Sequence, residues 1–145
     1  MAADTELPDL VALAQRALQL LDERRLDEWE QTMRPDATFI GPGMELHGSG
    51  QIRQFVEGFH HAFPDITHRI DRLLVAGDTV IMEGVFSGTH TGVLRTPGGD
   101  IPATGKRVEV REAQLVTVDQ DGLAIRFETY FDRREMMTQL GLTGR

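Results

Sequence analysis

Residues 104–141 read TGKRVEVREAQLVTVDQDGLAIRFETYFDRREMMTQLG. Two runs in this stretch, 107–119 and 123–131, are rich in β-branched residues and are separated by an Asp- and Gly-containing turn, which predicts a strand pair. A short helix from Arg133 to Leu140 follows, and it ends at Gly141, a residue type suited to the left-handed position after a helix. The stretch therefore predicts an antiparallel hairpin closed by a helix.

The upstream sequence changes period from helical to strand-like near residue 66. Apolar residues at helical spacing come first, and alternating, β-branched runs with short turns come after them. The predicted helices span about residues 8–24, 26–34 and 49–63, and the other predicted strands span 37–40, 66–76 and 79–90. Helices followed by sequential strands predict an α+β fold, in which a curved antiparallel sheet closes as a cone-shaped barrel around the N-terminal helices.

Composition excludes several classes of protein. The chain has 145 residues, of which 40% are hydrophobic and 26% charged, which predicts a single domain spanning residues 1–145. Its net charge is −8 and its basic residues are scattered, so nucleic acid is not an expected partner. The absence of cysteine excludes disulfides and thiolate chemistry. Neither a signal peptide nor a membrane-spanning run is recognisable, and a cytoplasmic protein without membrane contacts is expected.

Two polar residues interrupt an otherwise apolar row in the strand 107–119. Glu112 and Gln114 lie on the same face as four valines, because strand side chains alternate. This face either borders a ligand cavity between sheet and helices, or it faces solvent or another subunit. We favour the cavity, because a buried carboxylate is costly unless it is bonded or used. Its expected wall includes some of Phe55, Phe59, Phe63, Val110, Glu112 and Gln114.

Asp132 stands where the last strand enters the closing helix. Asp is a favoured N-cap residue, so a helix-capping role is one interpretation. A general acid or base is the other, and the residues alone leave the two open. Period-2 counting places Asp132 on the face of Tyr130 and opposite Phe131.

The histidines allow ligand contacts but predict no metal site. His90 lies between Gly88 and Gly92, where it either stabilises a turn or contacts a ligand, and His60 is expected on the helix that borders the cavity. His60 and His61 are adjacent, so on a helix they point about 100° apart and cannot chelate one ion together. Phosphate-loop and serine-hydrolase motifs are likewise missing.

A series of short motifs gives the chain a family resemblance over about residues 10–142. They are Phe63-Pro64-Asp65, Gly77-Asp78, Gly88-Thr89-His90-Thr91-Gly92, Thr104-Gly105-Lys106, Asp121-Gly122, Asp132 and Gln139-Leu140-Gly141. In this order they resemble the SnoaL-like polyketide cyclases, a branch of the nuclear transport factor 2-like superfamily. The resemblance implies an intramolecular aldol condensation without metal or organic cofactor, with Asp132 as the catalytic acid/base. By alignment, Gln114 stands where such cyclases place a His and Glu112 where they place a Gln, and a Gln amide cannot titrate.

The resulting expectation is an enzyme acting on a hydrophobic, oxygenated, polyketide-like ligand. Substrate contacts are assigned to Glu112, Gln114, His90, Phe59, Phe63, His60 and Tyr130. The alternative is a non-catalytic ligand-binding or association module in which Asp132 only caps the helix. A homodimer or homotetramer is also expected, because the outer sheet face is left uncovered and Leu123, Ile125, Phe127 and Phe131 are candidates for it.

Overall fold

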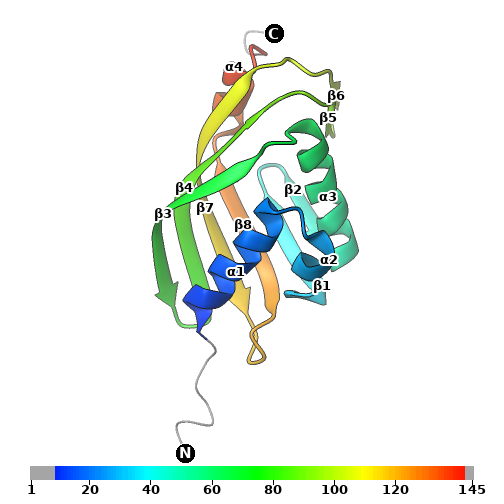
Figure 1. Cartoon of the computed structure of the whole chain (residues 1–145). Helices are drawn as coiled ribbons and strands as arrows, with labels where there is room; N and C mark the ends of the chain where they lie inside the picture. The colour runs from blue at the N-terminus through cyan, green and yellow to red at the C-terminus, as the bar shows by residue number, and fades with distance from the viewer. Residues whose placement is uncertain (1–8, 143–145) are drawn as a thin grey trace, which may run out of the picture.

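A computed structural model describes residues 9–142 of the chain. The helices are α1 (Leu10–Asp22), α2 (Leu26–Glu30), α3 (Ser49–Ala62) and α4 (Arg133–Gln139). The strands are β1 (Met33–Gly41), β2 (Met44–His47), β3 (Thr67–Ala76), β4 (Thr79–Thr89), β5 (Leu94–Thr96), β6 (Gly99–Ile101), β7 (Arg107–Val118) and β8 (Ala124–Phe131). Figure 1 shows a strongly curved sheet with α1, α2 and α3 against its concave side, which is the predicted α+β fold. Within the described residues, no helix is both long and apolar enough to cross a membrane.

The main sheet has the strand order β2-β1-β8-β7-β4-β3. Its pairs are antiparallel except for β1 and β8, which run parallel with Phe39 opposite Phe127. The expectation of a purely antiparallel sheet is therefore wrong at this one pair. A parallel pair needs a long crossover connection, and here most of the chain lies between the two strands.

The sequence analysis misplaced the elements that tertiary pairing defines. β1 begins at Met33, which was expected in the second helix, because Met33 pairs with Ala124 of β8. Arg34 also forms ion pairs with Asp119 and Asp121 in the β7–β8 turn, at 2.5 and 2.6 Å. β2 and the small β5–β6 sheet were not predicted at all, because each is short and gains its partner from the fold.

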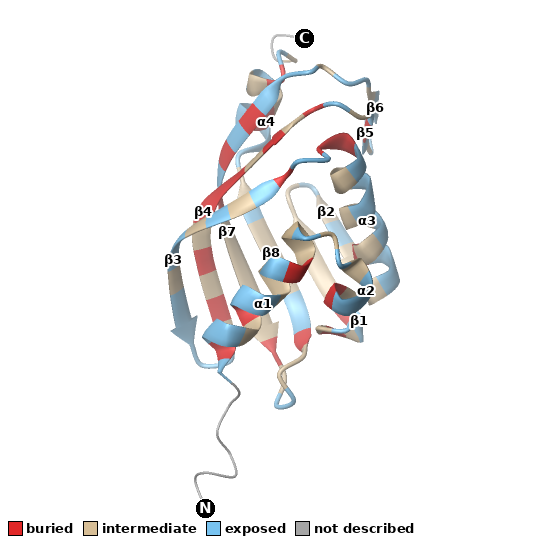
Figure 2. Ribbon diagram, in the orientation of Figure 1, coloured by how far each residue is buried: buried red, intermediate tan, exposed pale blue. Residues whose placement is uncertain are grey.

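The inner row of β7 is as predicted, whereas that of β8 is partly reversed. Val108 and Val110 are fully buried, and Glu112 follows them on the same face. Figure 2 shows buried positions alternating with exposed ones along the first part of β7. Across the pair, Phe131 lies opposite Glu112, so Phe131 also faces inward and is not part of an exposed patch. Phe127 is inward for the same reason. A register shift between Thr117 and Val118 breaks the alternation of β8, which leaves Ile125 outward.

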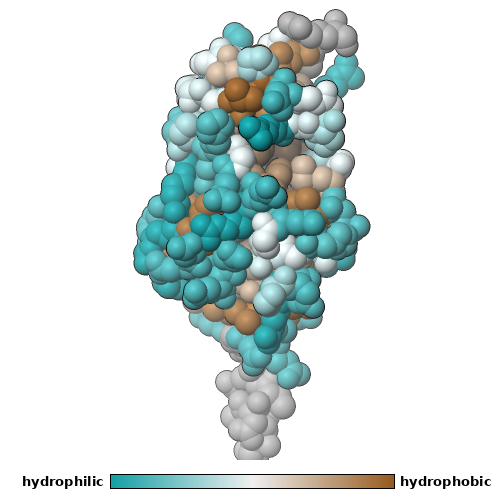
Figure 3. All heavy atoms as spheres, turned by 90° about the vertical axis from the view of Figure 1, so that its right-hand side faces the viewer, coloured by the Kyte–Doolittle hydropathy of each residue, from teal (hydrophilic) through white to brown (hydrophobic). Residues whose placement is uncertain are grey.

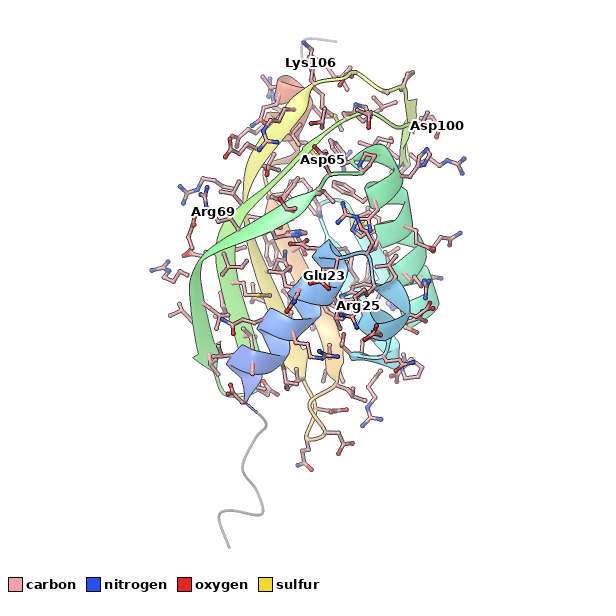
Figure 4. The ribbon with its side chains drawn as sticks, viewed as in Figure 1. Glu23, Arg25, Asp65, Arg69, Asp100 and Lys106 are labelled. Atoms are coloured by element: carbon pink, nitrogen blue, oxygen red, sulfur yellow. The ribbon has the colours of Figure 1, made fainter. Side chains whose placement is uncertain are left out.

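An aromatic ladder connects α3 to the sheet. Ring centroids are 5.4 Å apart for Phe39 and Phe55, 5.9 Å for Phe55 and Phe59, and 5.1 Å for Phe59 and Phe63. Pairs of this kind stabilise by about 0.5–1.5 kcal/mol each beyond the area they bury. Just after the C-terminal end of α3, Asp65 accepts hydrogen bonds from the Thr89 amide and hydroxyl at 2.7 and 3.0 Å, which ties the start of β3 to the end of β4 (Figure 4).

Candidate active site

A cavity of about 410 Å³ lies between the concave sheet face and the helices α1 and α3. Most of its wall is apolar, with aromatic side chains from α3 and from three strands. These are Phe39, Phe55, Phe59, Phe86, Phe127 and Phe131. Figure 3 shows the side of α3 and the β5–β6 hairpin, where hydrophobic atoms reach the surface among hydrophilic ones. The few polar side chains that converge on this cavity therefore define its chemistry.

Asp22 and His68 form a dyad at the cavity wall. Asp22 is the last residue of α1, and its Oδ1 lies 2.7 Å from Nδ1 of His68 in β3. Its other oxygen, Oδ2, accepts a hydrogen bond of 3.1 Å from the backbone amide of His68. A carboxylate is disfavoured at a helix C-terminus, so the β3 donors compensate for its position there. With Nδ1 donating to Asp22, Nε2 is the nitrogen available for chemistry. Figure 4 shows the neighbouring Arg69 pointing away from the helices, as strand alternation requires of His68's neighbour.

Arg24 fixes the backbone around this dyad. It has a left-handed φ of 64°, the one described non-glycine residue with positive φ. Its guanidinium donates hydrogen bonds to the carbonyls of Asp22, Pro64 and Ile66 at 2.8, 2.6 and 3.0 Å. The end of α1 is thereby joined to the segment that leads into β3. Arg24 is a positioning residue for the contact between Asp22 and His68.

Glu112 completes a chain of three titratable groups. Only 3% of its side chain is exposed, and its Oε2 lies 3.8 Å from Nε2 of His68. Oε2 has no hydrogen-bond partner among the described residues. β4 lies between β3 and β7, and its Gly84 is paired with Ile70 of β3 and with Glu112 of β7. Because glycine has no side chain, none separates β3 from β7 at this position. A Cβ on Gly84 would lie 1.9 Å from the carbonyl oxygen of Arg69, so only glycine fits.

Burial and charge shift the pKa values of Glu112 and His68 upward. Burial raises the pKa of the Glu112 carboxyl, and the charge of His68 and a hydrogen bond from Gln114 oppose this only in part. For His68, burial lowers the pKa, but the hydrogen bond to Asp22 and the charges of Glu112 and Asp22 outweigh burial and raise it overall. Each group's charge shifts the pKa of the other, so the titration of Glu112 and His68 is coupled.

His60 differs from His68 although both line the cavity. Burial, followed by the charges of Arg24 and His68, lowers the pKa of His60 to about 4. Its Nδ1 is buried without a hydrogen-bond partner among the described residues. His60 is therefore a neutral imidazole at neutral pH, able to exchange a hydrogen bond with a ligand but not to carry charge.

Comparison with known proteins places this arrangement in a family. The family model of the SnoaL-like domain matches residues 14–127. The chain belongs to the SnoaL-like family. No curated protein sequence matches the chain.

Solved structures share the SnoaL-like fold over nearly the whole chain. A candidate SnoaL-like polyketide cyclase from Jannaschia sp. CCS1 superposes with a TM-score of 0.81 and 23% identity, over 94% of this chain and 93% of that one. AclR, a candidate hydroxylase from Streptomyces galilaeus, gives 0.78 and 20% over 94% and 98%. IdmH, a candidate polyketide cyclase from Streptomyces antibioticus, gives 0.76 and 22% over 92% and 99%. At these identities the likeness establishes the fold.

Asp132 does not lie at the SnoaL-like cavity. It is the N-cap of α4, where its Oδ1 accepts a 3.1 Å hydrogen bond from the Glu135 amide. The residue is exposed and is not among those that line the cavity. Capping therefore accounts for this carboxylate, as one of the two sequence interpretations held. The geometry gives no support to its assignment as the catalytic acid/base.

The remaining predicted contacts divide into two groups. Glu112, Gln114, Phe59 and His60 line the cavity. Three others do not, and their expected contact with substrate has no geometric basis. They are Phe63, which is fully buried in the core, His90, which is fully buried and stacks on Phe63 at 5.2 Å, and Tyr130, which is 51% exposed.

His90 and Tyr130 are diverted for identifiable reasons. Nδ1 of His90 accepts a 3.2 Å hydrogen bond from the Thr104 amide, which holds the ring inside the loop that follows β4. Tyr130 points away from the inward Phe131 beside it, and its hydroxyl donates a hydrogen bond to Glu128.

The sequence analysis missed Asp22 and His68. His68 stands at every-second-residue spacing from the apolar Ile66 and Ile70, so all three share one face of the predicted strand. This spacing was a signal for an inward-facing polar group. Asp22 was also visible as a carboxylate in the unfavourable last turn of a helix. Within residues 9–142, no group of three or more His, Asp or Glu side chains is arranged to hold a metal ion.

Proposed function

We propose that this SnoaL-like protein is a cofactor-independent acid/base enzyme acting on a hydrophobic, oxygenated small molecule. The observation that carries the proposal is the chain Asp22–His68–Glu112 at the wall of a largely apolar cavity. Burying the Glu112 carboxyl beside His68 is costly unless the pair is used, and pairs of groups with perturbed pKa values concentrate at catalytic sites.

In the proposed reaction, Nε2 of His68 removes a proton from a carbon next to a substrate carbonyl. Asp22 stabilises the imidazolium that forms and keeps Nδ1 protonated. Glu112 in its protonated form donates a hydrogen bond to the oxygen of the developing enolate, and its burial raises the pKa of the carboxyl in that direction. Gln114 and the neutral His60 supply further hydrogen bonds at the same wall.

Ring closure is the specific reaction that we propose, in line with the candidate polyketide cyclases of the same fold. The enolate carbon attacks a second carbonyl of the same molecule and forms a carbon–carbon bond. The resulting alkoxide takes the proton from the His68 imidazolium, so the enzyme returns to its starting state. No electron acceptor is needed, because the aldol step moves only a proton and one bond.

The proposal can be tested without the natural substrate. A base next to a bound ketone exchanges the protons on the neighbouring carbon, so 2-tetralone in D2O should take up deuterium faster with the protein than in buffer. NMR measures the rate directly. His68→Gln should abolish the enhancement, whereas His61→Gln, at the exposed neighbour of His60, should retain it. No enhancement with the wild-type protein over a panel of bicyclic ketones would favour a non-catalytic binding module.

We also infer a homodimer, formed through the outer sheet face. The exposed apolar side chains that support it are Leu74, Ile125 and Tyr130, all on strands of the main sheet. Sedimentation at micromolar concentration should give a dimer. A monomer under these conditions would contradict the inference.

A further inference from the structure

Two arginines at the cavity have no carboxylate partner among residues 9–142. Most described arginines have a carboxylate within 4.0 Å: Arg16, Arg25, Arg34, Arg53, Arg69, Arg72 and Arg126. Among the described arginines without such a partner, Arg95 and Arg133 line the cavity. Arg133 makes one long hydrogen bond, 3.4 Å to the carbonyl of Pro42. In a chain with a net charge of −8, two such cations at one cavity form a local exception to the acidic surface.

Arg95 and Arg133 belong to the same end of the cavity. Arg95 follows Leu94 in β5, and Arg133 begins α4, one turn before Met136. Leu94 and Met136 belong to one buried cluster, and Arg95 and Arg133 both line the cavity beside it. Both arginines are exposed, which keeps their guanidinium groups hydrated at the cavity entrance.

An aromatic wall separates this end from the acid/base groups. Phe59 and Phe131 pack against the cluster that contains Leu94 and Met136. The ring of Phe86 lies 5.2 Å from Phe131 and 6.1 Å from Phe59, and Phe86 is paired with His68 on the neighbouring strand. The cavity thus has a titratable end at His68, an aromatic middle and a cationic end.

The other carboxylates at the cavity do not neutralise the arginines. Glu128 lies 2.7 Å from Arg126 and also accepts a bond from Tyr130, and Asp121 lies 2.6 Å from Arg34. Glu112 is at the titratable end with His68. An anionic ligand group is therefore favoured only at the arginine end.

We propose that Arg95 and Arg133 bind a carboxylate at the far end of the substrate from its reacting carbonyl. The ligand class is a hydrophobic carboxylic acid with an aromatic or polycyclic body. Guanidinium groups suit a carboxylate because they offer paired N–H donors in the same plane. The position of the reacting carbonyl rests on the proposed function, whereas the carboxylate site does not.

A matched pair of ligands tests this site by binding alone. 1-Pyrenebutyrate and 1-pyrenebutanol share the ring and chain and differ in the carboxylate. Trp29 is the single tryptophan and lines the cavity, so energy transfer from Trp29 to pyrene reports binding. The wild-type protein should bind the carboxylate about tenfold more tightly than the alcohol at low salt, and 0.3 M NaCl should reduce this preference.

Variants separate the arginine site from general charge effects. Arg95→Gln and Arg133→Gln should each lower the preference about threefold, and the double variant should bind both ligands equally. Arg134→Gln, at the exposed neighbour that does not line the cavity, should keep the wild-type preference.

Equal binding of the two ligands by the wild-type protein would overturn the site, as would a preference that survives in the double variant. Failure of this proposal is distinguishable from failure of the acid/base mechanism. His68→Gln should lose deuterium exchange and keep the carboxylate preference, so each readout stands without the other.

Discussion

Asp22 and Asp132 both lie at helix ends, yet the fold gives them opposite surroundings. Asp132 precedes α4, where the helix N-terminus attracts a carboxylate and the Glu135 amide bonds it. Asp22 ends α1, where the helix disfavours it, and it is held instead by His68. Asp132, at a helix N-terminus, stabilises its own helix. Asp22, at a helix C-terminus, is bonded to a titratable partner, His68, at the cavity. If His68 is the base, as we propose, the unfavourable position of Asp22 is the better indicator of function.

Replacing each aspartate by asparagine tests this difference between Asp22 and Asp132 with the largest expected effect. Asp22→Asn should reduce proton transfer about 100-fold, because an amide does not stabilise the His68 imidazolium or fix its tautomer. Asp132→Asn should leave the rate within about twofold, because Asn caps as well as Asp. Deuterium exchange on 2-tetralone measures both variants. The reverse ranking would return the catalytic role to Asp132.

The pH–rate profile of Glu112→Gln tests the role of Glu112 at the titratable end of the cavity. In the wild type, activity requires that Glu112 and His68 hold one proton between them, so the rate should fall at both low and high pH. A Gln amide donates at every pH, so the variant should lose the alkaline fall. Its remaining acidic fall should follow the protonation of His68 alone, without coupling to Glu112. An unchanged bell-shaped profile would exclude Glu112 as the second group.

Acid stability tests the neutral state of His60. Its pKa is about 4 in the folded protein, against 6.5 as the unperturbed value, so unfolded chains bind the extra proton first as pH falls. The stabilisation from neutral His60 is thus present above pH 6.5 and is lost as pH falls toward 4. Between pH 7 and pH 4.5, the free energy of unfolding of His60→Gln should fall by about 1–2 kcal/mol less than that of the wild type. Urea unfolding at both pH values measures the difference. His61→Gln, the exposed neighbour, is the control, and an equal effect of both variants would contradict the assignment.

The cap itself should account for the smallest effect. Asp132→Ala should lower the free energy of unfolding by about 1 kcal/mol, because the Glu135 amide loses its acceptor. The rate of deuterium exchange should not change. Urea unfolding of the variant against the wild type measures the loss, and a stability equal to that of the wild type would show that the hydrogen bond is not retained in solution.

The sequence predicted best where one strand's own alternation decides the outcome. Glu112 and Gln114 stood out as polar residues in the apolar row of β7, and they line the cavity. The same counting put Asp132 on the side of Tyr130, away from Phe131. The prediction that Asp132 is catalytic came from the family resemblance and not from the residues themselves. Local pattern was therefore more informative than the motif at this position.

The sequence failed where remote segments create the site. Asp22 and His68 are 46 residues apart, and the sequence of neither segment indicates that the two side chains are in contact. A register shift between Ile70 and Arg72 also interrupts the alternation of β3 just beyond His68. Likewise, β1 starts early and β2 exists only because neighbouring strands supply their hydrogen bonds. Such features depend on tertiary contacts and not on propensity.

The most direct test of the account is the deuterium exchange rate of 2-tetralone in three proteins: wild type, His68→Gln and Asp132→Asn. The account predicts that His68→Gln lowers the enzyme-catalysed rate by about two to four orders of magnitude, while Asp132→Asn keeps the wild-type rate. Circular dichroism of each variant checks that the fold is intact. A folded His68→Gln variant that exchanges at the wild-type rate would contradict the central claim that His68 transfers the proton.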